Sequence, residues 1–168
     1  MSDYGRRIVV DSGFETAVGD LSRAIREEGL RVIARVDVRE HFRRELGRDF
    51  RQYFMLEAWS PELAREALKQ NLDVGAVLPT GFSVYELADG ETAVVAREPL
   101  SPLAEDPAWR RSSPLLATIV DRETTRVARV FSRLQAHAQE NSDGSVASTG
   151  RSGVHDGVFE SSFLCARR

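Results

Sequence analysis

The 168-residue sequence has almost no cysteine and almost no lysine. Its only cysteine, Cys165, cannot form an intramolecular disulfide, and no cysteine-built zinc site is possible. Lys69 is the only lysine, so arginine carries nearly all of the positive charge. The formal net charge is −3, which does not favour a general affinity for nucleic acid or anionic lipid.

Long apolar runs are also missing. No stretch approaches the roughly 20 apolar residues needed to cross a bilayer, and no basic-then-apolar leader opens the sequence. Together with the single cysteine, this predicts a protein of the reducing cytoplasm that makes no membrane contact.

The familiar motifs of catalytic and cofactor sites are absent as well. There is no phosphate-binding glycine loop, nucleophile elbow, paired-histidine helix or calcium loop. The three histidines, His41, His137 and His155, lie in separate segments and are expected to be solvated surface residues. We therefore expect no metal and no cofactor, and the sequence favours a non-enzymatic role.

Apolar periodicity predicts an α+β protein in which strands and helices alternate. The predicted strands span residues 5–11, 30–38, 51–58, 74–78, 82–87 and 92–97, and the predicted helices span about 14–28, 38–46, 61–71 and 115–138. Asp37 and Gly47 are suited to cap the short second helix, and Ser60 followed by Pro61 is typical of a helix start. Residues 99–114 are predicted to be a connecting loop with one helical turn around Trp109.

The chain divides into a single α+β domain over 1–139 and a tail over 140–168. Residues 141–157 are mostly Ser, Gly, Asp, Thr and Asn, and such a segment buries too little to offset its ordering entropy. A small apolar island, Phe159, Phe163 and Leu164, follows near the end. We expect the tail to be disordered.

Two groups of residues could form a binding site. The first is an arginine-rich patch around the second helix: Arg39, Arg43, Arg44, Arg48 and Arg51. It could contact an anion or nucleic acid. The alternative is an ordinary solvated face, which is favoured because acids lie among the arginines and the overall charge is acidic.

The second group lies at two strand ends, Ala58-Trp59-Ser60-Pro61 and Leu78-Pro79-Thr80-Gly81. If the two strands are neighbours, Trp59, Ser60 and Thr80 would surround one pocket beside a helix N-terminus, which favours anions. The alternative is that these residues are only caps and turns around a structural tryptophan.

These segments carry a resemblance to a known family, the domain of unknown function 302, found in bacteria and archaea. The matching stretches are Glu28-Gly29-Leu30, Val36-Asp37-Val38, Leu46-Gly47, Phe50 through Tyr53, Ala58 through Ala64, Val74 through Pro79, and Val84-Tyr85. The resemblance covers roughly residues 4–137. It implies a two-layer sandwich, with an antiparallel or mixed sheet and helices on one face in a TATA-binding-protein-like arrangement, and a homodimer.

The resemblance implies no activity. Many members of the family carry cysteine where this chain has Trp59 and Thr80. A pair of thiols there would suit soft-metal or redox chemistry, which this chain cannot perform at that place.

The leading hypothesis is therefore a non-catalytic, dimeric module that binds a small ligand or another protein. The candidate ligand-binding residues are Asp37, Arg51, Tyr53, Trp59, Ser60 and Thr80, and the expected ligand is a small anionic or planar metabolite. One alternative is an enzyme of unknown class that uses Asp37 as an acid or base beside Thr80 or Ser60, which requires those side chains to lie about 3–4 Å apart or around one substrate. The other, less favoured, is nucleic-acid binding through the arginine-rich helix.

Overall fold

A computed structural model describes residues 5–76, 78–87, 90–97 and 106–148. Most of the expected C-terminal tail, with Cys165 and the apolar island at Phe159, Phe163 and Leu164, lies outside the described residues. Among the described helices, none is long and apolar enough to cross a membrane.

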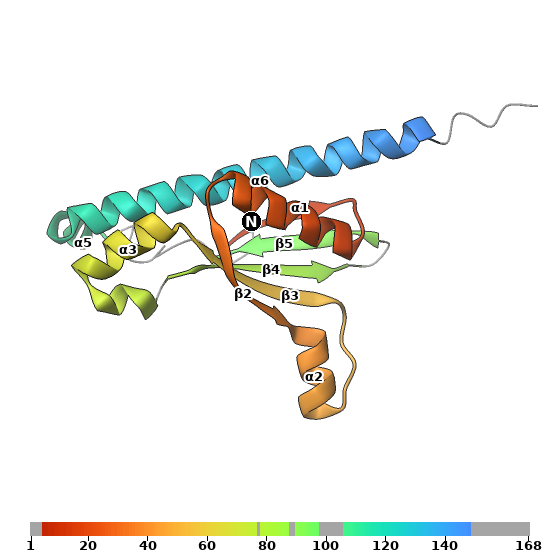
Figure 1. Cartoon of the computed structure of the whole chain (residues 1–168), viewed down its shortest axis with the longest axis horizontal. Helices are drawn as coiled ribbons and strands as arrows, with labels where there is room; N and C mark the ends of the chain where they lie inside the picture. The colour runs from red at the N-terminus through yellow and green to blue at the C-terminus, as the bar shows by residue number, and fades with distance from the viewer. Residues whose placement is uncertain (1–4, 77, 88–89, 98–105, 149–168) are drawn as a thin grey trace, which may run out of the picture.

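Five antiparallel strands form one open sheet in the order β1-β5-β4-β3-β2 (Figure 1). They are β1 (Arg6–Val10), β2 (Arg31–Asp37), β3 (Tyr53–Trp59), β4 (Thr80–Glu86) and β5 (Thr92–Ala96). The first strand of the chain therefore pairs with the last, with Arg6 opposite Ala96.

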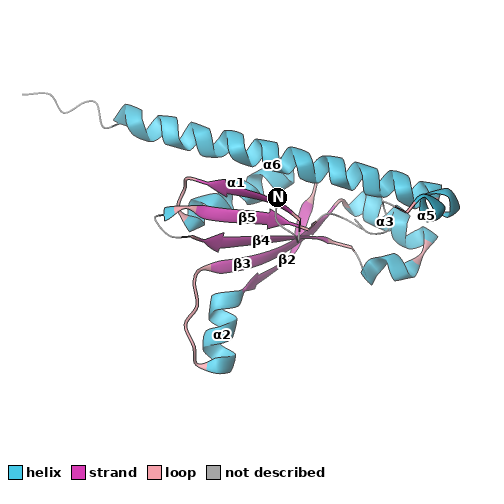
Figure 2. Cartoon of the chain, turned by 180° about the vertical axis from the view of Figure 1, so that it is seen from behind, coloured by secondary structure: helices cyan, strands magenta, loops and turns pink. Residues whose placement is uncertain are grey.

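The helices connect these strands or follow them. They are α1 (Phe14–Glu27), α2 (Val38–Leu46), α3 (Pro61–Gln70), the 3₁₀ helix η1 (Leu72–Ala76), α5 (Pro107–Ser112) and α6 (Pro114–Ser148). Figures 1 and 2 show α1 and α6 along the same side of the sheet, α3 and α5 near one end of α6, and α2 projecting away from the rest.

The core lies between the sheet and the layer of α1 and α6. Side chains alternate along a strand, so Phe54, Leu56 and Ala58 of β3 point toward the helices and are buried. Leu21 and Ile25 of α1 and Leu134 of α6 pack in the same cluster. The predicted α+β sandwich with helices on one face of its sheet is confirmed.

No helix among the described elements covers the other side of the sheet, which we call the open face. Its larger apolar and aromatic side chains are Val9, Val36, Tyr53, Met55, Tyr85 and Val95, and Arg7 and Ser83 lie among them. Met55 is 44% exposed, and Val9 and Val36 are exposed to a similar degree. Leu56, the next residue of β3 after Met55, is only 2% exposed. Neighbouring residues of this strand therefore lie in opposite environments.

The predicted strand at 74–78 is wrong. Leu72–Ala76 form the 3₁₀ helix η1. The Asn71 side-chain oxygen accepts a hydrogen bond from the Asp73 backbone N–H at 2.9 Å, and this local bond favours a turn over an extended strand. The next strand begins only at Thr80, after a cis peptide bond between Leu78 and Pro79.

The final helix is longer than the sequence pattern predicts. The predicted span was 115–138, whereas α6 runs to Ser148, so residues 140–148 of the expected tail are helical. The helical turn expected near Trp109 is present as α5, and residues 99–105 of the same expected loop lie outside the described residues.

Candidate functional site

The six predicted ligand residues gather at opposite ends of β3. Asp37 pairs with Phe54 near the start of that strand, whereas Thr80 pairs with Ala58 near its end. Those partners are four residues apart, or about 13 Å at the ordinary rise of a strand. Asp37 therefore does not lie beside Thr80, and the geometry required by the acid–base hypothesis is not met.

Asp37 instead caps α2, as its position in the sequence predicts. Its Oδ1 accepts a hydrogen bond from the Glu40 backbone N–H at 2.9 Å. At the other end of α2, Gly47 has a positive φ of 63°, a conformation that suits glycine. These two caps fix the ends of a helix that buries none of its own residues.

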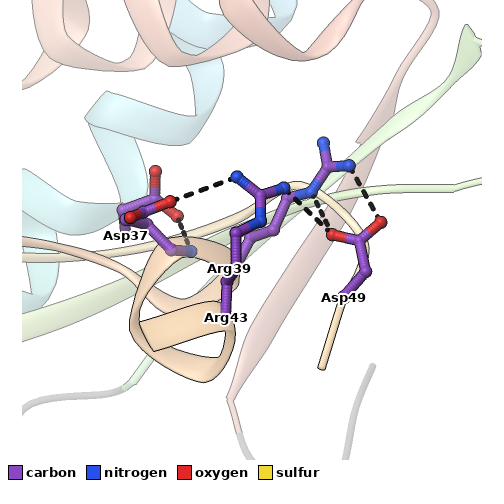
Figure 3. Close-up of polar contacts among 5 residues, drawn as sticks. Asp37, Arg39, Arg43 and Asp49 are labelled. Carbon is purple, nitrogen blue, oxygen red and sulfur yellow. Dashed lines mark hydrogen bonds and ion pairs between the residues drawn. The ribbon is translucent and has the colours of Figure 1, made fainter. Parts of the chain in front are cut away.

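Two arginines of α2 are held by one carboxylate of the following loop (Figure 3). Arg39 donates to Asp49 through Nε at 2.8 Å and through Nη2 at 3.0 Å, and Arg43 adds a bond at 3.2 Å. The pKa of Asp49 is held well below its usual range. The hydrogen bonds from Arg39 are the largest cause, and the Phe50 backbone N–H and Arg43 add to the effect. Arg39 and Arg43, two of the five arginines predicted to contact an anion, are thus already bonded within the chain.

A cavity of about 180 Å³ opens beside this cluster, and we call it the α2 pocket. It is lined by Phe14, Glu15, Asp37, Arg39, Glu40, Arg43, Gln52, Tyr53 and Phe54. Three of these side chains are acidic, and the two arginines among them donate to Asp49. An anion that entered this pocket would have to compete with Asp49 for the arginines.

Tyr53 and Arg51 lie next to the α2 pocket. Tyr53 stacks on Tyr85 of the neighbouring strand, with ring centroids 5.4 Å apart and planes 12° apart. Arg51 donates to the backbone carbonyl of Glu86 at 3.3 Å and lines an adjoining open depression of about 460 Å³. Three of the six predicted residues, Asp37, Arg51 and Tyr53, are therefore brought to the same end of the sheet.

Replacing Asp49 with Asn should loosen α2. The neutral amide cannot match the charge-assisted bonds to Arg39 and Arg43, so we expect amide hydrogen exchange of residues 42–46 to become a few-fold faster. Because the pKa of Asp49 is lowered in the folded protein, this stabilisation is present at neutral pH and is lost as pH falls below the ordinary aspartate range.

The control for that measurement is Glu45→Gln. Glu45 accepts a hydrogen bond from its neighbour Arg44 at 2.8 Å, within α2 itself, and not from the two arginines that Asp49 holds. We expect little change in exchange for this variant. Equal exchange in wild type and Asp49→Asn would show that the arginine clamp does not hold α2.

At the other end of β3, the three predicted residues do not share a pocket. Ser60 and Thr80 are buried, whereas Trp59 points to the opposite face of the strand and lines a surface groove along α3. Ser60 caps α3, accepting from the Leu63 backbone N–H at 3.4 Å. The Thr80 hydroxyl is buried without a hydrogen-bond partner.

Sequence reasoning missed Glu123 of α6. Its side chain is 3% exposed, both carboxyl oxygens lack a hydrogen-bond partner, and it lines a cavity of about 10 Å³ among apolar residues of α3, η1 and α6. Burial raises its pKa, an effect that Arg126 and the Ser60 backbone N–H oppose. The signal was available, because Glu123 falls on the apolar stripe of α6 between Val120 and Val127.

The family model for the domain of unknown function DUF302 matches residues 7–140. The chain belongs to this family. A similar fold is seen in the crystal structure of an uncharacterized conserved DUF302 protein from Bacillus stearothermophilus, with a TM-score of 0.56 and 26% sequence identity. The match covers 74% of this chain and 98% of that chain. No curated protein matches the sequence.

The resemblance predicted from the sequence motifs is therefore confirmed. The DUF302 description assigns no activity, so function must be argued from the side chains. Among the described residues, no group of three or more His, Cys, Asp and Glu side chains is arranged to hold a metal ion.

Proposed function

We propose that this DUF302 protein is a non-catalytic homodimeric binding module that associates through the open face of its sheet. The observation that carries the proposal is the contrast between the two faces. One is covered by α1 and α6, and the other presents exposed Val9, Val36 and Met55. Exposed apolar side chains gathered on one uncovered face of a sheet are typical of association sites.

Helix α2 extends the same apolar surface. Its apolar stripe includes Phe42 and Leu46, yet none of its residues is buried, and Leu46 is 62% exposed. A row of aromatic contacts runs from Phe42 through Phe50 and Tyr53 to Tyr85 on the open face. A short helix depends on tertiary packing for most of its stability, and α2 buries no residue within one chain. A second copy of the chain would supply that packing.

The test is the mass of the protein in solution. We expect wild type to sediment at twice the 18.7 kDa of one chain and Met55→Asp to sediment as a monomer. The substitution places a charge at the centre of the open face, where a buried unpaired carboxylate is strongly unfavourable. Circular dichroism should remain that of the folded protein, because Met55 packs in no core cluster.

Leu115→Asp is the matched control. Leu115 is 45% exposed, nearly the same as Met55, but it lies on α6, which packs on the other side of the sheet. We expect Leu115→Asp to stay dimeric. A monomeric wild type at tens of micromolar would contradict the proposal, and so would a dimer that survives Met55→Asp but not Leu115→Asp.

Ligand binding at the α2 end would involve Asp37, Arg51 and Tyr53, which line the α2 pocket and the adjoining depression. The arginine patch is less suited to nucleic acid, because Arg39, Arg43 and Arg44 all donate to carboxylates. Among the described residues, the acid–base arrangement that the sequence suggested, Asp37 beside Thr80, is not assembled. The scarcity of cysteine supports placing this module in the reducing cytoplasm.

A further inference from the structure

An apolar groove runs along the outer side of α3, at the end of the sheet opposite the α2 pocket. Its volume is about 460 Å³, within the ordinary range for small-molecule sites. It is lined by Trp59, Pro61, Ala64, Arg65, Leu68, Lys69 and Leu72. We refer to it as the Trp59 groove.

The groove combines an apolar floor with a cationic rim. Trp59, Leu68 and Leu72 give it apolar surface, and Leu72 is one of the most exposed apolar side chains of the described residues. Arg65 and Lys69 are exposed at the rim, and no carboxylate is among the lining residues. This charge is the reverse of that in the α2 pocket, where three acids line the cavity.

The rim formed by Arg65 and Lys69 keeps a net positive charge although both side chains are paired. Both bond to Glu66, at 3.1 Å each, so a single carboxylate serves two cations. Exposed pairs of this kind are weak and exchange readily with water or another anion. Arg65 offers a planar guanidinium that can bind a carboxylate through two parallel hydrogen bonds.

The groove is separated from the open face although Met55 and Trp59 lie on the same side of β3. Glu57 stands between them and lies 3.8 Å from Arg97, whose guanidinium also donates to the Pro79 carbonyl at 2.6 Å. This charged pair interrupts the apolar surface between the two places. A ligand in the groove therefore need not touch the surface that we assign to dimer formation.

We propose that the Trp59 groove binds a planar organic anion, an aromatic carboxylate whose ring packs on Trp59 and whose carboxylate bonds to Arg65 and Lys69. This proposal rests on the proposed function as a binding module and names the ligand class and the place. Ring stacking against an indole contributes about 0.5–1.5 kcal/mol beyond the apolar contact area. The anionic group supplies selectivity against neutral rings of the same shape.

The experiment is an NMR titration of the ¹⁵N-labelled protein with 1-naphthoate, compared with the neutral isostere 1-naphthylmethanol. The sequence holds only two tryptophans, Trp59 and Trp109, so two indole N–H signals report the site and an internal reference. The Trp109→Phe variant assigns them. We expect 1-naphthoate to shift the Trp59 signal saturably, and the alcohol to bind at least five-fold more weakly.

The charge requirement is tested with the double variant Arg65→Gln/Lys69→Gln, which should weaken 1-naphthoate binding about ten-fold and bring it near that of the alcohol. A matched double variant, Arg48→Gln/Arg111→Gln, removes two exposed arginines elsewhere and should bind as wild type. Equal binding of acid and alcohol, a shift confined to Trp109, or no saturation below 10 mM would each overturn the proposal.

Dimer formation and the groove can fail separately. The same titration on Met55→Asp should give the wild-type affinity if the groove is complete within one chain. Binding by wild type and not by folded Met55→Asp would place the ligand in the dimer interface and overturn the assignment to the groove. Conversely, saturable binding by a monomeric wild type would leave the groove intact and reject only the proposed dimer.

Discussion

Glu123→Gln should raise the free energy of unfolding at pH 7, because a buried charge costs more to remove from water than a neutral amide of the same shape. Glu123 is buried, its carboxyl oxygens have no hydrogen-bond partner, and Arg126 lies 4.0 Å away. Burial therefore outweighs the attraction of Arg126 and raises the pKa of Glu123 in the folded protein. The amide keeps the shape of the side chain and removes the charge.

The sign of the pH dependence follows from that raised pKa. A carboxyl whose pKa is higher in the folded state favours folding when it is protonated, so its contribution is present below the ordinary glutamate pKa of about 4.3 and is lost as pH rises through the folded value. The advantage of Glu123→Gln should therefore be largest at neutral pH and should vanish near pH 4.

Urea unfolding at a series of pH values measures this effect. Glu140→Gln, on the exposed side of the same helix, is the control and should change stability by no more than about 0.5 kcal/mol at any pH. Destabilisation by Glu123→Gln at pH 7 would mean that Arg126 holds the carboxylate in its charged form.

Leu56→Ala should be the more damaging of two neighbouring substitutions on β3, with a loss of about 2–5 kcal/mol. Leu56 is 2% exposed and packs in the core beneath α1 and α6. Alanine would leave a cavity there, because the surrounding side chains can close only part of the space. Thermal or urea unfolding would measure the loss.

Met55→Ala is the matched change on the opposite face. Met55 is 44% exposed in one chain, so its truncation should change the stability of the monomer by less than about 1 kcal/mol. Its effect should instead appear as weaker self-association, because the apolar contact between copies is reduced. Equal losses for the two variants in dilute, monomeric samples would contradict the assignment of one covered and one open face.

Much of the fold could be predicted from local sequence because local signals determine it. Asp37 and Gly47 cap α2, Ser60 and Pro61 start α3, and alternation at Phe54, Leu56 and Ala58 marks the covered face of β3. The errors also have local causes. A side-chain bond from Asn71 converts a strand-like run into η1, and residues 140–148 continue α6 although their composition is polar.

The site was harder to predict because it depends on contacts between distant segments. The sequence suggested that Asp37 could lie near Thr80, yet the strand register places them at opposite ends of β3. Trp59 and Ser60 are neighbours in the chain but face opposite sides of the strand. Burial of Glu123 arises only when α3, η1 and α6 pack together, so its charge alone could not reveal it.

The pairing of β1 with β5 has a consequence for how the protein is made. Arg6 lies opposite Ala96 in the finished sheet, so the first strand must wait until nearly a hundred residues have left the ribosome. Until then, the pairing edge of β1 has no native partner. Pairing across so large a sequence separation is slow, so β1–β5 is the strand pair of this sheet with the longest interval between the synthesis of its first strand and its completion.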